Sequence, residues 1–148
     1  MRPKLLLLCL SPLLVPWSIA AQPRHQITPR QAHRIVVLVA GHDNIDLSDT
    51  HVQINSMDLS AEFAPGFYSF IIIRESTSPG PDETLRRYAV SQRTGDVWEM
   101  TLCTHYNFPE LTRLQHIFSG RTTANASELA AQGKLLGCSV APAGNPAL

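Results

Sequence analysis

The stretch YAVSQRTGDVWEM, residues 88–100, predicts a tight β-hairpin and with it the antiparallel character of the fold. On both sides of Arg93-Thr94-Gly95-Asp96, apolar residues alternate with polar ones, which is the pattern of half-buried strands. Arg93 and Thr94 suit the corner of a type I turn, and Gly95 suits the left-handed conformation of a G1 bulge. The turn therefore explains Gly95 without any ligand.

The same alternation assigns the side chains of the second strand to faces. We expect Trp98, Met100 and Leu102 to share the buried face of their strand, because residues two apart in a strand point the same way. Glu99 and Thr101 then point toward solvent.

The segments before and after this hairpin complete an α+β pattern. Thr28 and Gln31 form a capping box ahead of a helix over residues 29–40, although its β-branched residues also allow a strand. Apolar and polar residues alternate over 51–55, and residues 67–74 are almost continuously apolar, so both segments are predicted to be strands. Apolar residues recur at helical spacing over 107–120 and 126–136, which predicts two further helices. We therefore expect an N-terminal helix packed on a four-stranded antiparallel meander, with two C-terminal helices. The apolar strand 67–74 is expected to be covered on both sides.

The N-terminus has the three-part pattern of a secretory signal peptide. A basic start, an apolar segment and small residues at the cleavage point predict a signal over residues 1–21. A membrane anchor is the alternative, but Pro12 and Pro16 interrupt the apolar segment. Cleavage leaves a single α+β domain over residues 22–148, with an ordered core of about 27–138. The predicted location is secreted or periplasmic.

The mature chain has little charge and two cysteines. Losing Arg2 and Lys4 leaves 10 basic and 12 acidic residues, so nucleic acid is not an expected partner. Cys9 leaves with the signal, and Cys103 and Cys138 are expected to form one disulfide in an oxidising compartment. The alternative is two free thiols in a reducing compartment.

No motif for catalysis, a cofactor or a metal is present in the sequence. The six histidines show no HExxH pattern, and no G-x-S-x-G motif occurs. Cys103 with His105 does not make a nucleophile if Cys103 is bridged to Cys138. We expect no catalytic, cofactor-binding or metal-binding residues. A pocket that held His42 with Asp43, or His105 with Glu99, would instead favour an enzyme.

The hairpin also carries a family resemblance. A leading helix against an antiparallel sheet, with the pattern Y-x-V-x-x-x-T-G at Tyr88–Gly95, resembles small exported bacterial domains of the cystatin-like or PepSY-like kind. The resemblance covers Thr28 to Cys103 and implies an inhibitory, regulatory or binding module. The helical extension from Phe108 to Leu136 is additional. The cystatin loop Q-x-V-x-G is absent at Gln53–Met57, so protease inhibition is not implied.

These observations favour an exported small binding or inhibitory module that acts through protein–protein contact and has no catalytic activity. Arg86, Arg87 and Arg93, with Asp96, are the candidate partner-binding residues, and we expect Arg93 and Asp96 to point into water. The alternative for the arginines is an edge strand kept soluble by charge. The partner would be a protein of unknown identity, with no membrane contact after cleavage. The alternative function is a secreted hydrolase with an unrecognised active site.

Overall fold

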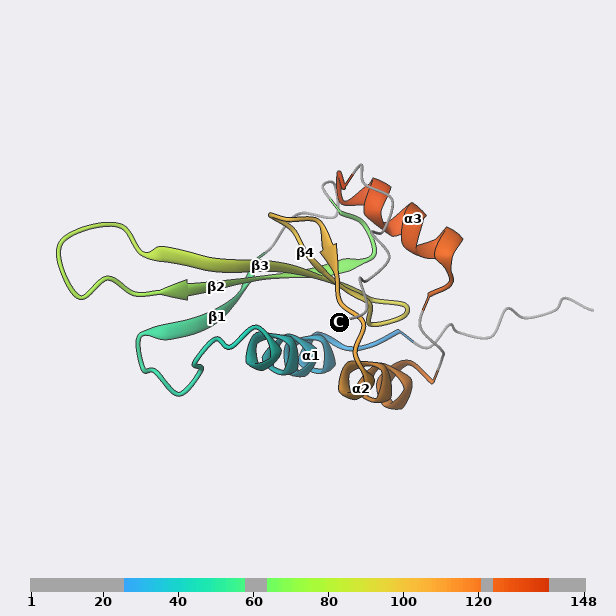
Figure 1. Ribbon diagram of the computed structural model, residues 1–148, viewed down its shortest axis with the longest axis horizontal. Coiled ribbons are helices and arrows are strands. Elements are labelled where there is room, and N and C mark those ends of the chain that lie inside the picture. The colour runs from blue at the N-terminus through green and yellow to red at the C-terminus, as the bar shows by residue number, and fades with distance from the viewer. Residues whose placement is uncertain (1–25, 58–63, 121–123, 139–148) are drawn as a thin grey trace, which may run out of the picture.

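A five-stranded antiparallel sheet with strand order β1-β2-β3-β4-β5 organises the protein. The computed structural model describes residues 26–57, 64–120 and 124–138 (Figure 1). The elements are α1 (Pro29–His42), β1 (Val52–Met57), β2 (Phe67–Arg74), β3 (Glu83–Ser91), β4 (Val97–Glu99), β5 (Thr104–His105), α2 (Pro109–Ser119) and α3 (Ala126–Leu135). The predicted α+β class with an antiparallel sheet and three helices is confirmed. The predicted count of four strands is wrong, because β5 adds a short fifth strand. The predicted signal peptide lies outside the described residues.

The first helix forms where its capping box predicted it. The Thr28 side chain accepts from the Gln31 backbone amide, and the Gln31 side chain accepts from the Thr28 amide. The helix continues through Gly41 to His42, two residues beyond the expected end. Its buried stripe consists of Ala32, Ile35, Val36, Val39 and Ala40. A helix therefore wins over the strand alternative, since this spacing gives one continuous apolar face.

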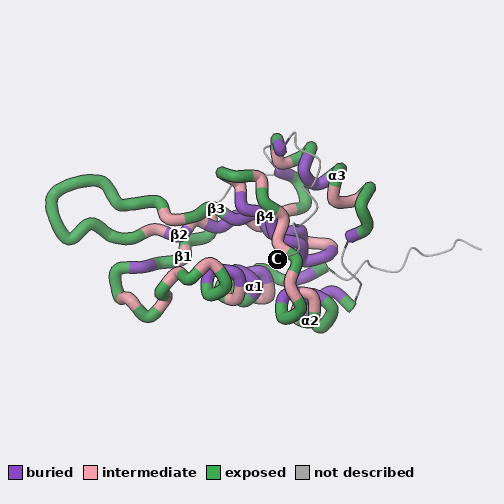
Figure 2. The backbone as a smooth tube through the Cα atoms, viewed as in Figure 1, coloured by how far each residue is buried: buried purple, intermediate pink, exposed green. Residues whose placement is uncertain are grey.

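The main core lies between this stripe and one face of the sheet. Figures 1 and 2 show α1 and α2 on that side, with buried backbone where they meet the strands. The sheet and α2 contribute Phe70, Ile72, Tyr88, Val90, Val97, Leu111 and Phe118. We call this side of the sheet the core face and the opposite side the outer face.

The third helix packs against the outer face at Trp98. The indole is 1% exposed, and its Nε1 donates to Gln132 Oε1 at 3.0 Å. A Cβ atom at Gly133 would lie 3.2 Å from Trp98 Cη2, so the glycine that weakens the helical pattern lets the helix approach the ring. Cys103 and Cys138 are joined by a disulfide, with their Cα atoms 5.4 Å apart, at the C-terminal end of α3.

The chain leaves the sheet earlier than the alternation suggested. β4 ends at Glu99, and the next residues form a turn in which the Leu102 amide donates to the Glu99 carboxylate. Leu102 is 71% exposed and Glu99 only 2% exposed, so both predicted orientations are wrong. The turn explains Leu102, since period-two alternation assigns faces only while the strand continues. Glu99 still belongs to β4 and alternates with Trp98, but it lies opposite Tyr88, so it points to the core face rather than to solvent.

The predicted turn in the β3–β4 hairpin is confirmed. Gly95 has φ +76°, and its amide donates to the Ser91 carbonyl at 2.8 Å. The site is also crowded, because a Cβ atom at Gly95 would lie 3.2 Å from Ile35 Cδ1 and 3.3 Å from Gln115 Cγ. Gln115 Nε2 donates to the Gly95 carbonyl at 3.0 Å. Gly95 therefore satisfies a backbone requirement and a packing requirement together.

Alanine substitutions at Trp98 and Leu102 compare the loss of stability at a buried and at an exposed position. Trp98→Ala should lower the free energy of unfolding by about 3–5 kcal/mol, as a large-to-small change in a packed site. Leu102→Ala should change it by less than about 0.5 kcal/mol, because Leu102 faces solvent. Urea denaturation followed by circular dichroism measures both. Equal losses for the two variants would contradict the assignment of faces.

Gly95 and Gly120 provide a second matched pair. Both have positive φ, but a Cβ atom at Gly120 would meet nothing within 4 Å. Gly120→Ala should therefore cost only the left-handed strain of about 1 kcal/mol. Gly95→Ala should cost ~1 kcal/mol or more beyond that, because the methyl group also displaces Ile35 or Gln115. Thermal and urea unfolding of both variants provide the test, and a smaller loss for Gly95→Ala would refute the packing argument.

Candidate protein-binding surface

The candidate surface lies on the part of the sheet that extends beyond the helices. We call it the outer lobe; it comprises residues 44–57 and 67–87, that is β1, β2, the start of β3 and their loops. Figure 1 shows the β2–β3 hairpin projecting past α1, with α3 beside β4 at the other end of the sheet. Figure 2 shows that the hairpin loop is exposed. One face of this lobe carries core residues such as Phe70 and Ile72, whereas its outer face, its β1 edge and its loops are not used by the core.

The outer face of the lobe has an apolar centre and polar borders. Asn55 lies opposite Ile71, which lies opposite Arg87, so the three side chains form one row across the strands. Gln53 and Ile73 form the next row. Ile71 and Ile73 are half-buried, so the prediction that this strand is covered on both sides is wrong for these positions. Half-exposed isoleucines bordered by polar side chains are typical of a protein contact surface.

Two recesses adjoin the lobe. One of about 480 Å³ lies between the start of α1 and the strands, where His33, Ser56 and Phe70 line it. The other, of about 360 Å³, lies at the base of the β2–β3 hairpin. In the second recess Glu75 accepts from Gln53, and Arg74 pairs with Glu83 at 3.1 Å. Of its charged side chains, Arg74 and Glu83 are therefore paired with each other.

The three candidate arginines point to three different places. Arg86 Nε lies 3.8 Å from Asp43 Oδ2 on the core face, whereas Arg87 lies in the outer-face row opposite Ile71. Arg93 forms an ion pair with Glu128 of α3. The structure does not bring them together into a basic edge. Of the three, Arg87 alone belongs to the outer face of the lobe.

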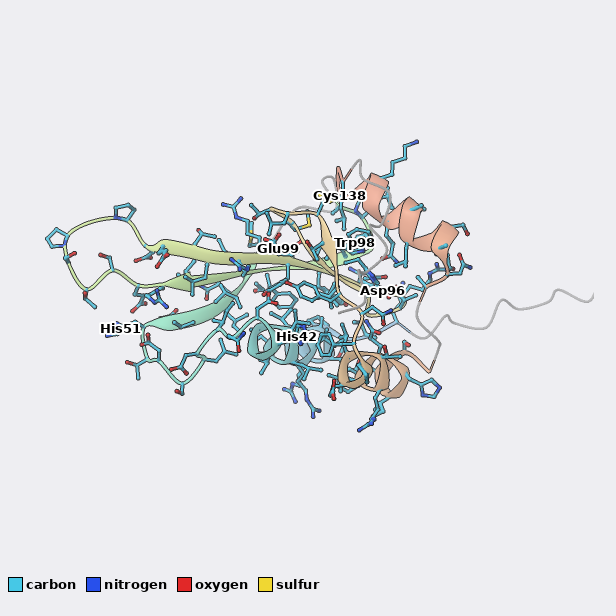
Figure 3. All side chains as sticks on the ribbon, in the orientation of Figure 1. His42, His51, Asp96, Trp98, Glu99 and Cys138 are labelled. Atoms are coloured by element: carbon cyan, nitrogen blue, oxygen red, sulfur yellow. A yellow bond between two sulfur atoms is a disulfide. The ribbon has the colours of Figure 1, made fainter. Side chains whose placement is uncertain are left out.

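Asp96 is buried, so the expectation that its side chain points into water is wrong. Its carboxylate is 0% exposed and accepts from Thr94 Oγ1 and from Gln132 Nε2 at Oδ2. Oδ1 faces His105 Nε2 at 3.5 Å, and neither atom has another hydrogen-bond partner among the described residues. Figure 3 shows Asp96 and Trp98 close to α3. No local sequence pattern indicates this burial, because Gln132 is 36 residues away from Asp96.

The electrostatics of Asp96 reflect these contacts. Burial alone would raise the pKa of the carboxyl, but the facing His105 and the donors Thr94 and Gln132 together hold the pKa below its ordinary value. An aspartate beside a histidine suggests a catalytic pair. Here the Asp96 side chain is 0% exposed and the His105 side chain 11%, with the Trp98 ring 5.1 Å from the His105 ring, and neither residue lines the recesses described above. The arrangement instead anchors α3 to the hairpin.

A second polar cluster surrounds Asp43 at the end of α1. The hydroxyl groups of Tyr88 and Tyr106 both donate to Asp43 Oδ2. Burial, and then the adjacent carboxylate, raises the pKa of both tyrosines above the usual value, so they remain hydrogen-bond donors. His42 stacks on Phe108 with ring centroids 4.1 Å apart. Both rings therefore have structural contacts, and His42 lines neither recess described above.

Residues 26–57, 64–120 and 124–138 contain neither a metal-binding cluster nor a membrane-spanning helix. These residues contain no group of three or more His, Cys, Asp or Glu that could hold a metal ion. No helix within them has the length and apolar character needed to cross a bilayer.

Comparison with known proteins points to one class. The family model described as "Effector immunity protein Tgi2PP" matches residues 44–86. A solved structure, "Structure of a type VI secretion system effector-immunity complex from Pseudomonas protegens", contains a similar chain with a TM-score of 0.66 and 29% sequence identity. The match covers 76% of this chain and 91% of that chain. No curated protein matches.

The resemblance to cystatin-like and PepSY-like domains is wrong, since the similarity is to effector immunity proteins. The hairpin motif that suggested it specifies a left-handed glycine and strand alternation. Unrelated α+β domains share both features, so such a motif does not identify a family. The chain is similar to an immunity family over residues 44–86 and to a chain of an effector–immunity complex over most of its length.

Proposed function

We propose that this protein is an immunity protein that binds a type VI secretion effector and neutralises it by direct contact. The observation that carries the proposal is the similarity to a chain of an effector–immunity complex, at 29% identity over 91% of that chain. The match of the immunity family model supports it independently.

The position of the family match supports the same function. Residues 44–86 include the loop after α1, β1, β2 and the start of β3. Within this range, residues 44–57 and 67–86 belong to the outer lobe, whose β2–β3 hairpin projects beyond α1 (Figure 1). The partner is therefore a protein, and it contacts a surface that the core leaves free.

The protein acts by binding and has no catalytic activity of its own. The Asp96–His105 pair is enclosed, and the Asp43 cluster is occupied by two tyrosine hydroxyls. A hydrolase would need such groups to reach a substrate. The immunity function needs only a complementary surface.

The protein acts in an oxidising compartment, which in a bacterium is the periplasm. The signal-peptide pattern over residues 1–21 and the Cys103–Cys138 disulfide support this location. An immunity protein there meets effectors that arrive from neighbouring cells.

Co-expression with an effector tests the proposal. The probe is the effector encoded next to this gene, directed to the periplasm of a host where it stops growth. Co-expression of the full chain should restore growth, and the two purified proteins should elute together in size-exclusion chromatography. A variant lacking residues 1–21 is the matched control and should fail to protect while still binding in vitro. An effector that neither binds the purified protein nor loses toxicity would refute the proposed function.

A further inference from the structure

We infer that the effector supplies an extended segment that pairs with the free edge of β1 as a sixth strand of the sheet. This inference rests on the proposed immunity function and names the part of the outer lobe that makes the contact. Its basis is the direction of the β1 backbone groups, the composition of β1 and the contrast with the opposite edge.

The hydrogen-bond pattern shows which β1 groups point outward. The Glu75 amide donates to the His51 carbonyl at 2.8 Å, so His51 and Glu75 form a hydrogen-bonded pair of the antiparallel ladder. Such pairs alternate along an antiparallel ladder, and the register continues through Gln53↔Ile73 and Asn55↔Ile71. The backbone groups of Gln53 and Asn55 therefore face β2. Those of Ile54 and Ser56, between them, face away from β2, toward the free edge.

A contact at the start of β1 agrees with this assignment. Val52 lies two residues before Ile54 and four before Ser56, so its backbone groups point to the same side of the strand as theirs. The Val52 amide donates to the Asp49 carbonyl in the preceding loop at 3.0 Å rather than to β2. No described residue pairs with the outer backbone groups of Ile54 and Ser56. Unpaired strand groups of this kind are a template for another strand.

The composition of β1 leaves this edge open to pairing. The strand reads VQINSM over Val52–Met57, without a charged residue or a proline, and its register with β2 is regular. Natural edge strands usually carry charges, proline or a bulge that prevent pairing with another chain. The opposite edge strand, β5, has only two residues and offers no such length. A regular, uncharged edge of six residues is therefore suited to strand addition, as in other peptide-recognition domains.

The side chains beside this edge indicate the chemistry of the added segment. Val52, Ile54 and Ser56 point to the core face, and Gln53, Asn55 and Met57 point to the outer face. Side chains that lie opposite each other on neighbouring strands stabilise the pair best when an apolar side chain faces an apolar one and a hydrogen-bonding side chain faces another. The effector segment should therefore alternate apolar residues with uncharged polar residues. Ser56 also lines the 480 Å³ recess, which has room for one apolar side chain of that segment.

Substitution of Ser56 tests the inference with a matched control. Ser56→Pro removes an outward amide and places a ring at the edge without breaking a bond to β2. Isothermal titration calorimetry with the effector from the neighbouring gene should show binding at least about tenfold weaker. The substitution removes one hydrogen bond between β1 and the effector strand, and the proline ring keeps the two strands apart. Ser56→Ala keeps the amide, so its affinity should stay within about threefold of the wild type. Undiminished binding by folded Ser56→Pro would overturn the inference.

Residue-resolved amide exchange keeps the inference testable if Ser56→Pro does not fold. In the free wild-type protein the Ile54 and Ser56 amides should exchange quickly, and the Gln53 and Asn55 amides slowly. Binding should slow Ile54 and Ser56. A complex in which both still exchange quickly would overturn strand addition, and contact through the outer face would then explain binding. If the wild type does not bind the effector at all, the proposed function fails, and the two failures are thereby distinguished.

Discussion

The turn at residues 93–96 is the constraint on which the rest of the structure depends, because it contacts all three helices. Gly95 packs against Ile35 of α1 and accepts from Gln115 of α2. Asp96 accepts from Gln132 of α3, and Arg93 pairs with Glu128 of the same helix. A buried carboxylate is costly unless it is well satisfied. The position of α3 is therefore coupled to the side-chain hydrogen bonds of this turn, in addition to its contact with Trp98 and the disulfide.

This anchoring divides the molecule into two parts with different roles. The end of the sheet near the turn is enclosed by helices, and its polar groups are used within the protein. The outer lobe has one face and one edge that no described helix covers (Figure 1). Similarity to the immunity family falls on this second part, over residues 44–86. An enclosed end that holds the β1 edge in place would lower the ordering cost of binding there, which fits the proposed immunity function.

The sequence predicted the features that depend on local chemistry. The capping box at Thr28, the left-handed Gly95 and the apolar strand 67–74 all appear where expected, because each depends on residues close in the chain. It did not predict the burial of Asp96, which is enclosed through Gln132, 36 residues away, or that of Glu99, which accepts from the turn beyond β4. Of the candidate partner-binding residues, Arg87 lies on the outer face of the lobe. The free edge of β1 could have been suspected from its lack of charge, but only the register shows which amides point outward.

The most direct test of the anchoring role is the pH dependence of the stability difference between wild type and Asp96→Ala. The folded-state pKa of Asp96 lies below its unfolded value of about 3.9, so its ionisation stabilises the fold above that pH, and this contribution is lost as the pH falls through the folded pKa. Urea unfolding should show the variant less stable by about 3 kcal/mol or more at pH 7, since it leaves the donors of a buried carboxylate unpaired. The difference should narrow below about pH 4. A difference near zero at pH 7, or one that does not change with pH, would contradict the account.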